Sequence, residues 1–177
     1  MRKIILVICF LSLLCCKKGK RENQTISPQI EQFKQAKLEL IIEVIVQQDD
    51  VFELYYYEQG EKTFSSQNFV YNRINGKNEV QEITFVIPVG IYPERLRIDL
   101  GKNNEQEEMF FNGAKLIFGK KEYVFSKEEI NEQFKPSKFM LFDPITRSIK
   151  TQSINNRYDP YFYTMKVNSI VDYLMED

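Results

Sequence analysis

A regular alternation of apolar and polar side chains constrains the fold of this chain more than any other feature of its sequence. In KLELIIEVIV, residues 37–46, the even positions are all apolar: Leu38, Leu40, Ile42, Val44 and Val46. Successive side chains of a β-strand point to opposite faces, so this spacing gives a strand one apolar face. The segment therefore predicts a β-strand that is buried on one side.

The same period of two recurs in VFELYYYE (residues 51–58), EVQEITFVIP (79–88) and RLRIDLG (95–101). The apolar side chains that share a face are Phe52, Leu54 and Tyr56, then Ile83, Phe85 and Ile87, then Leu96, Ile98 and Leu100. Residues 66–74 predict an edge strand, and Asn75-Gly76 after it is a turn sequence. Residues 114–119 and 121–125 predict a hairpin through Gly119-Lys120. Short strands separated by turns predict a mainly β fold, an antiparallel β-sandwich of jelly-roll-like type.

One helix is predicted after these strands. Ser126 and Glu129 have the spacing of a capping box, which predicts a helix over residues 127–134, ended by Pro136. Residues 138–143 and 148–153 are expected to be strands, whereas residues 159–167 are ambiguous. Ile170, Val171 and Leu174 have helical spacing near the end of the chain, and a frayed tail or a last strand is the alternative.

The first sixteen residues have the features of an export signal. Arg2 and Lys3 precede an uncharged stretch over residues 4–14, which is too short to span a bilayer, and Cys15-Cys16 follow. A basic start, a short apolar core and a terminal cysteine resemble the lipobox of bacterial lipoproteins. In that family the cysteine after the cleavage site receives a diacylglycerol thioether, so residues 1–15 are expected to be a signal peptide.

Cys16 is the expected lipidation site, because Leu13 and the small Cys15 then occupy the positions that a lipobox prefers. The alternative is Cys15, which places Ser12 and the bulky Leu14 there. An uncleaved apolar anchor is a further alternative. Two or three acyl chains hold a protein on a bilayer, so the resemblance implies a palmitate-type lipid anchor. Residues 16–36 are polar and are expected to form a tether, and residues 37–177 a single domain.

The tether also bears on the location of the protein. Lys17, Lys18, Lys20 and Arg21 lie close to the lipidated cysteine and can contact anionic headgroups, with a solvated linker as the alternative. In Bacteroidetes-like lipoproteins, surface export is associated with acidic residues just after the cysteine, whereas this chain has basic residues there. The resemblance therefore implies the bacterial cell envelope, at the outer membrane and facing the periplasm.

Missing residue types exclude several functions. The chain contains no histidine, so histidine-based catalytic triads and histidine-ligated zinc sites are absent. All three cysteines precede residue 17, and no glycine-rich phosphate loop is present. The formal net charge of −1 gives no basic face for nucleic acid. The sequence therefore predicts a non-catalytic protein with no cofactor and no metal site. An enzyme that uses two facing carboxylates, as a glycosidase does, is the alternative, although no spacing of Asp and Glu marks such a pair.

Three segments, FELYYYEQG, EITFVIP and RLRIDLG, resemble β-sandwich accessory domains of bacterial envelope and glycan-assembly proteins. Those domains are similar to galactose-binding and carbohydrate-binding jelly rolls, and the resemblance covers residues 37–120. It implies a non-catalytic module that binds a glycan or an envelope partner. The alternative is a structural or accessory subunit of an envelope protein complex.

Two outward rows are the candidate ligand-binding residues. Tyr55 and Tyr57 lie opposite the apolar face of their strand, and Arg95, Arg97 and Asp99 form a similar row on another strand. Aromatic rings can contact sugar faces, and charged planar groups can bind hydroxyls. The alternative is that loops or the C-terminal segment cover this face and bury the tyrosines, and that Arg97 only pairs with Glu53.

The lipobox-like stretch gives a testable prediction. Cys16→Ser removes the thiol that accepts the lipid but leaves the apolar export sequence intact. We expect the variant to be exported without acylation, measured by fatty-acid labelling and by membrane fractionation. Cys15→Ser is the matched control and should still be labelled. Unchanged labelling and full membrane retention of Cys16→Ser would contradict the assignment.

Overall fold

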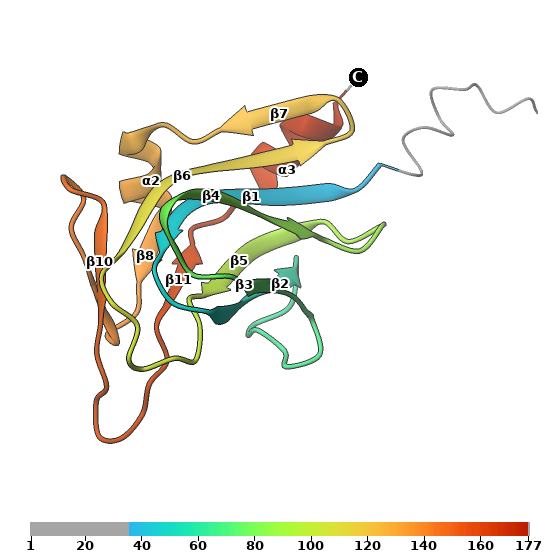
Figure 1. Cartoon of the computed structure of the whole chain (residues 1–177). Helices are drawn as coiled ribbons and strands as arrows, with labels where there is room; N and C mark the ends of the chain where they lie inside the picture. Colours follow the sequence, from blue (N-terminus) through green and yellow to red (C-terminus); the bar gives the residue numbers. More distant parts are fainter. Residues whose placement is uncertain (1–35, 177) are drawn as a thin grey trace, which may run out of the picture.

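The computed structural model describes residues 36–176, which form two antiparallel β-sheets and two short helices (Figure 1). The larger sheet consists of β4 (Lys77–Val86), β1 (Leu38–Val46), β6 (Met109–Phe118), β10 (Ser148–Thr151) and β9 (Met140–Phe142), in this order, with β7 (Lys121–Val124) also paired to β6. The five-stranded sheet has the order β3 (Phe69–Ile74), β2 (Asp50–Glu58), β5 (Pro93–Asp99), β11 (Tyr161–Thr164) and β8 (Phe134–Pro136). The predicted mainly β, antiparallel sandwich is confirmed.

The two sheets lie as two layers, and the apolar faces read from the sequence meet between them. Figure 1 shows β1, β4, β6 and β7 in the upper part of the view and β2, β3 and β5 below. Every side chain of the predicted apolar sets is at most 7 % exposed, from Leu38 in β1 to Leu100 after β5. These side chains belong to one continuous core.

A group of phenylalanine rings connects the layers within that core. Phe111 of β6 lies 5.5 Å from Phe134 of β8 and 5.2 Å from Phe162 of β11, between ring centroids. Phe125 and Phe142 pack against the same group, each 5.2 Å from one of its rings. Since aromatic rings bury large areas, this group joins the larger sheet to the far edge of the five-stranded sheet.

The helix at the predicted capping box is α2 (Lys127–Gln133). Ser126 accepts a hydrogen bond from the Glu129 backbone N–H, and the Glu129 carboxylate accepts one from the Ser126 backbone N–H. Pro136 does not stop this helix. The chain is already extended from Phe134, where β8 begins and pairs with β11.

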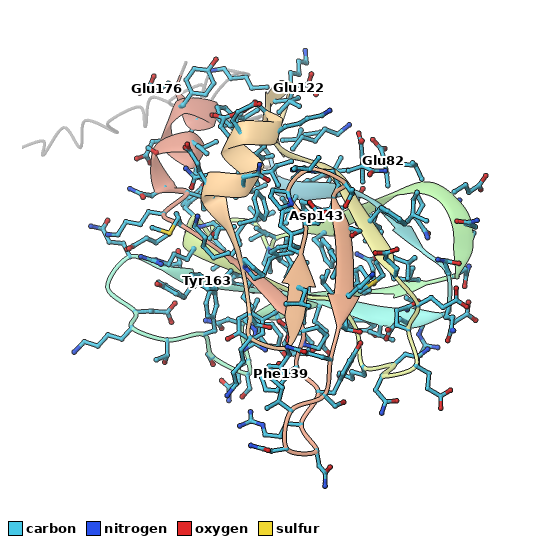
Figure 2. All side chains as sticks on the ribbon, turned by 90° about the vertical axis from the view of Figure 1, so that its left-hand side faces the viewer. Glu82, Glu122, Phe139, Asp143, Tyr163 and Glu176 are labelled. Atoms are coloured by element: carbon cyan, nitrogen blue, oxygen red, sulfur yellow. The ribbon has the colours of Figure 1, made fainter. Side chains whose placement is uncertain are left out.

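The second helix is α3 (Asn168–Met175), and the helical reading of this tail is confirmed. Val171 and Leu174 are buried, and α3 contacts β5 as well as β6 and β7, so it covers one end of both sheets. Figure 2 shows α2 and α3 at this end, far from Phe139. The ambiguous segment 159–167 contains β11, and β8 to β11 complete both sheets well beyond residue 120.

Among residues 36–176, neither helix has the length and apolar character needed to cross a bilayer. The predicted signal peptide and Cys16 lie outside the described residues, as does the tether up to residue 35.

The Asp50 carboxylate ties the start of β2 to the loop after β5. Its oxygens accept hydrogen bonds from the backbone N–H groups of Lys102 and Asn103, at 2.8 and 3.3 Å. Gly101 allows this close approach, because it has a φ of +98° and its Cα lies beside the carboxylate. A Cβ atom at Gly101 would overlap the Asp50 side chain.

We expect Gly101→Ala to destabilise the fold strongly. Gly60→Ala is the matched control, because Gly60 has a similar φ of +95° but open space around a new Cβ. The control should lose about 1–2 kcal/mol from backbone strain alone. Gly101→Ala should lose about 3 kcal/mol or more, since it also displaces Asp50. Urea unfolding measures both, and equal losses would show that the contact with Asp50 contributes nothing.

Candidate binding face of the five-stranded sheet

The pairing of β2 with β5 brings the two predicted rows together. Tyr55 lies opposite Arg97, and Tyr57 lies opposite Arg95. Glu53 lies opposite Asp99 in the same register. Because directly opposed residues of a sheet point to the same side, all five candidate residues lie on the face turned away from the core. The sequence identified both rows but not that they are neighbours.

The flanking strands add aromatic rings on both sides of these rows. On β3, Tyr71 lies opposite Glu53 and Phe69 opposite Tyr55. On β11, Tyr161 lies opposite Asp99 and Tyr163 opposite Arg97. We define the outer face by ten residues: Glu53, Tyr55, Tyr57, Phe69, Tyr71, Arg95, Arg97, Asp99, Tyr161 and Tyr163.

Sequence reasoning missed the rings contributed by β3 and β11. A signal was present, because Phe69 and Tyr71 are two residues apart and so are Tyr161 and Tyr163. The order of the strands, which no local pattern encodes, is what places these pairs beside Tyr55 and Arg97.

Planar groups are stacked across four neighbouring strands of the outer face. The rings of Phe69 and Tyr55 are 5.1 Å apart and inclined by only 22°. The guanidinium carbon of Arg97 lies 5.6 Å from the Tyr55 ring centre and 3.8 Å from that of Tyr161. Arg97 therefore lies between two tyrosines, an arrangement that cation–π attraction stabilises by about 0.5–2 kcal/mol.

Hydrogen bonds and ion pairs hold the centre of this stack. Arg97 donates to both oxygens of Asp99, at 2.6 and 2.8 Å, and to Asp159 at 2.7 Å. Glu53 instead accepts from the Lys102 ammonium at 2.6 Å and from the Tyr55 hydroxyl at 2.9 Å. The alternative that Arg97 pairs with Glu53 is therefore wrong, since each has other partners.

Burial changes the protonation behaviour of two groups in the centre. Burial raises the pKa of Asp99 to about 6, although Arg97 acts against this change. Burial and the hydrogen bond to Glu53 raise the pKa of the Tyr55 hydroxyl to about 12. The Tyr55 hydroxyl is thus protonated at neutral pH, in agreement with its role as a donor.

The accessible part of the outer face differs from the residues chosen from the sequence. Tyr55, Tyr57, Arg95 and Arg97 are half-buried, and Glu53 is buried. The neighbours Phe69 and Tyr163 are each 36 % exposed, and Tyr71 is 59 % exposed. The centre of the outer face is therefore half-buried among neighbouring side chains, while the rings at its two sides are open to solvent.

This geometry suits binding through a preorganised surface. The side chains of the centre are fixed by stacking and ion pairs, so little rotamer entropy remains to be lost on association. Within residues 36–176, no group of three or more carboxylate or thiol side chains is arranged to hold a metal ion.

Comparison with known proteins gives no relative for this chain. No protein-family model matches it, and no curated protein or solved structure gives a significant match.

The raised pKa of Asp99 predicts a pH-dependent stability. The folded chain binds the Asp99 proton more tightly than the unfolded chain, whose pKa is about 3.9. The stabilising contribution of Asp99 is therefore greatest below pH 4 and is lost as the pH rises through 6. We expect the difference in unfolding free energy between wild type and Asp99→Asn to fall by about 2–3 kcal/mol between pH 4 and pH 7.

Asp143→Asn is the control, because the pKa of Asp143 is lowered whereas that of Asp99 is raised. Asp143 accepts hydrogen bonds from the backbone N–H groups of Ile145 and Thr146, which lower its pKa. Its contribution should be present at neutral pH and be lost on acidification. Urea unfolding at several pH values measures both variants, and a difference for Asp99→Asn that does not change with pH would contradict the prediction.

Proposed function

We propose that this chain is a non-catalytic, lipid-anchored lipoprotein of the bacterial cell envelope. It acts as a binding module, and its outer face binds a glycan or an envelope partner. The observation that carries the proposal is the set of stacked planar groups around Arg97, drawn from four strands. The export signal and Cys16 support the location, because they resemble the lipobox of envelope lipoproteins.

The composition of the outer face supports a role in binding. Interface residues that contribute most of the binding energy are enriched in tyrosine and arginine. The outer face has five tyrosines and two arginines on one side of a single sheet. The exposed rings of Phe69, Tyr71 and Tyr163 lie on this same side of the sheet.

Glycan binding is supported by the mixture of rings and hydrogen-bonding groups. Tyr163 lies opposite Arg97 in the sheet register, and Asp99 and Asp159 form ion pairs with the Arg97 guanidinium. A sugar placed on Tyr163 could thus contact an aromatic ring and nearby charged groups together, a combination that ligand sites commonly show.

A protein partner is the second candidate, supported by a specific feature of the stack. The ring of Tyr55 already contacts Phe69 and Arg97, and that of Tyr161 is covered by Arg97. These ring faces are not available to a sugar. If the chain is an accessory subunit of an envelope complex, the exposed rings of Phe69, Tyr71 and Tyr163 would contact its protein partner.

The proposal predicts that Tyr163→Ala weakens binding while the protein stays folded. The full-length lipidated chain is used to capture its ligand from its own envelope fraction. Tyr92→Ala is the matched control, since Tyr92 is 40 % exposed, close to the 36 % of Tyr163, but packs near Phe118 of the larger sheet. We expect Tyr163→Ala to reduce capture about tenfold, a loss of about 1.4 kcal/mol.

Competition with soluble envelope glycans separates the two candidates. Loss of capture on adding the glycans supports a glycan ligand. Capture that depends on Tyr163 but is unaffected by glycans supports the accessory-subunit function. Equal capture by wild type, Tyr163→Ala and Tyr92→Ala would rule out the outer face as the binding surface.

A further inference from the structure

The strand β3 forms an open edge of the five-stranded sheet. It is hydrogen-bonded to β2 on one side and is the last strand of its sheet. Its six residues, FVYNRI, contain neither proline nor lysine. Exposed edges of this kind can pair with another strand, and proteins usually protect them with such residues.

The register shows which backbone groups point outward from this edge. Tyr56 donates its backbone N–H to the Asn68 carbonyl, so these two residues form a hydrogen-bonded pair. In an antiparallel ladder such pairs alternate with pairs that do not bond. The backbone groups of Val70, Asn72 and Ile74 therefore face β2. Those of the other three residues, Phe69, Tyr71 and Arg73, face the open edge.

The same three residues carry exposed side chains on one side of the sheet. Phe69 is 36 % exposed and Tyr71 is 59 % exposed. Arg73 is exposed and forms no ion pair within residues 36–176. Open backbone donors and acceptors thus coincide with two aromatic rings and an unpaired cation.

This order of residues is complementary to itself. If two β3 strands run antiparallel with Tyr71 at the centre, Tyr71 lies opposite Tyr71 of the second copy, and Phe69 lies opposite its Arg73. Three hydrogen-bonded pairs would give about six backbone hydrogen bonds. A register centred on Arg73 would place two like charges directly opposite each other, which is destabilising.

The second copy would also complete the stack of planar groups. One side of the Phe69 ring packs on Tyr55, which continues to Arg97 and Tyr161. In the register centred on Tyr71, Arg73 of the second copy lies beside Phe69 and can form a cation–π contact with it. Each copy would thereby supply a residue to the outer face of the other.

We propose that two copies of this chain pair through their β3 strands, antiparallel and centred on Tyr71, so that the two five-stranded sheets become continuous. This pairing does not depend on which ligand the outer face binds. Attachment to one membrane would favour it, since anchoring raises the effective concentration of the two copies. The joined face would present two binding surfaces side by side.

Disulfide crosslinking of the full-length chain in membranes tests the proposal. The two Tyr71 positions would be directly opposite, at a Cα separation of about 5.5 Å that suits a disulfide. Tyr71→Cys should therefore form a covalent dimer under mild oxidation. Val124→Cys is the matched control, because Val124 is 61 % exposed, as Tyr71 is, but lies on β7 of the other sheet. The unsubstituted chain controls for the native cysteines.

Two further variants test the register. Phe69→Cys alone should give no dimer, because its two copies would be ~14 Å apart along the strands. Mixing chains that carry Phe69→Cys with chains that carry Arg73→Cys should restore the crosslink. A dimer of Tyr71→Cys no more abundant than that of Val124→Cys would overturn the proposal. Crosslinking mainly to a different protein would also overturn it, and would assign the edge to another partner.

Proline substitutions provide a second measurement that does not use thiols. Tyr71→Pro removes an N–H that faces the open edge, so the chain should fold and lose the dimer. Asn72→Pro removes an N–H that bonds to β2 and should destabilise the fold. Circular dichroism monitors folding, and chemical crosslinking with an amine-reactive reagent monitors dimers. A folded Tyr71→Pro chain that dimerises like wild type would contradict pairing through β3.

Discussion

The register between β2 and β5 determines which side chains lie in the core and which lie on the outer face. It places Tyr55 beside Arg97 and Glu53 beside Asp99, and the same register buries Phe52 and Leu54 on the opposite side. A shift by one residue would exchange the two faces of the strand. The core therefore fixes the outer face, because the large apolar side chains between the sheets allow only one register.

Local patterns in the sequence predicted much of the fold. The strands around Leu40, Phe85 and Ile98 follow from a period of two, and α2 follows from the Ser126 capping box. The end of α2 was less predictable, because Phe134 leaves the helix to pack into the core and pair with β11. Tertiary packing overrode the local stop that Pro136 suggested.

The candidate site was predictable only in part, since it depends on contacts between distant segments. The five residues chosen from the sequence lie together, but their half-buried state follows from β3 and β11 on either side. Arg97 pairs with Asp159, which is 62 residues away in the sequence and has no spacing that relates it to Arg97. Only the order of the strands brings such residues together, and no local spacing encodes this order.

Burial of Asp99 at the centre of the outer face reduces stability at neutral pH, but the same carboxylate positions Arg97. Burial of Asp99 disfavours its charged form, as its raised pKa shows, and such partly desolvated carboxylates usually reduce stability at neutral pH. Its hydrogen bonds hold the Arg97 guanidinium over the Tyr161 ring. This arrangement would preorganise the outer face for the binding proposed above. Because rigid aromatic and arginine side chains lose little entropy on binding, a surface of modest area can still bind with useful affinity.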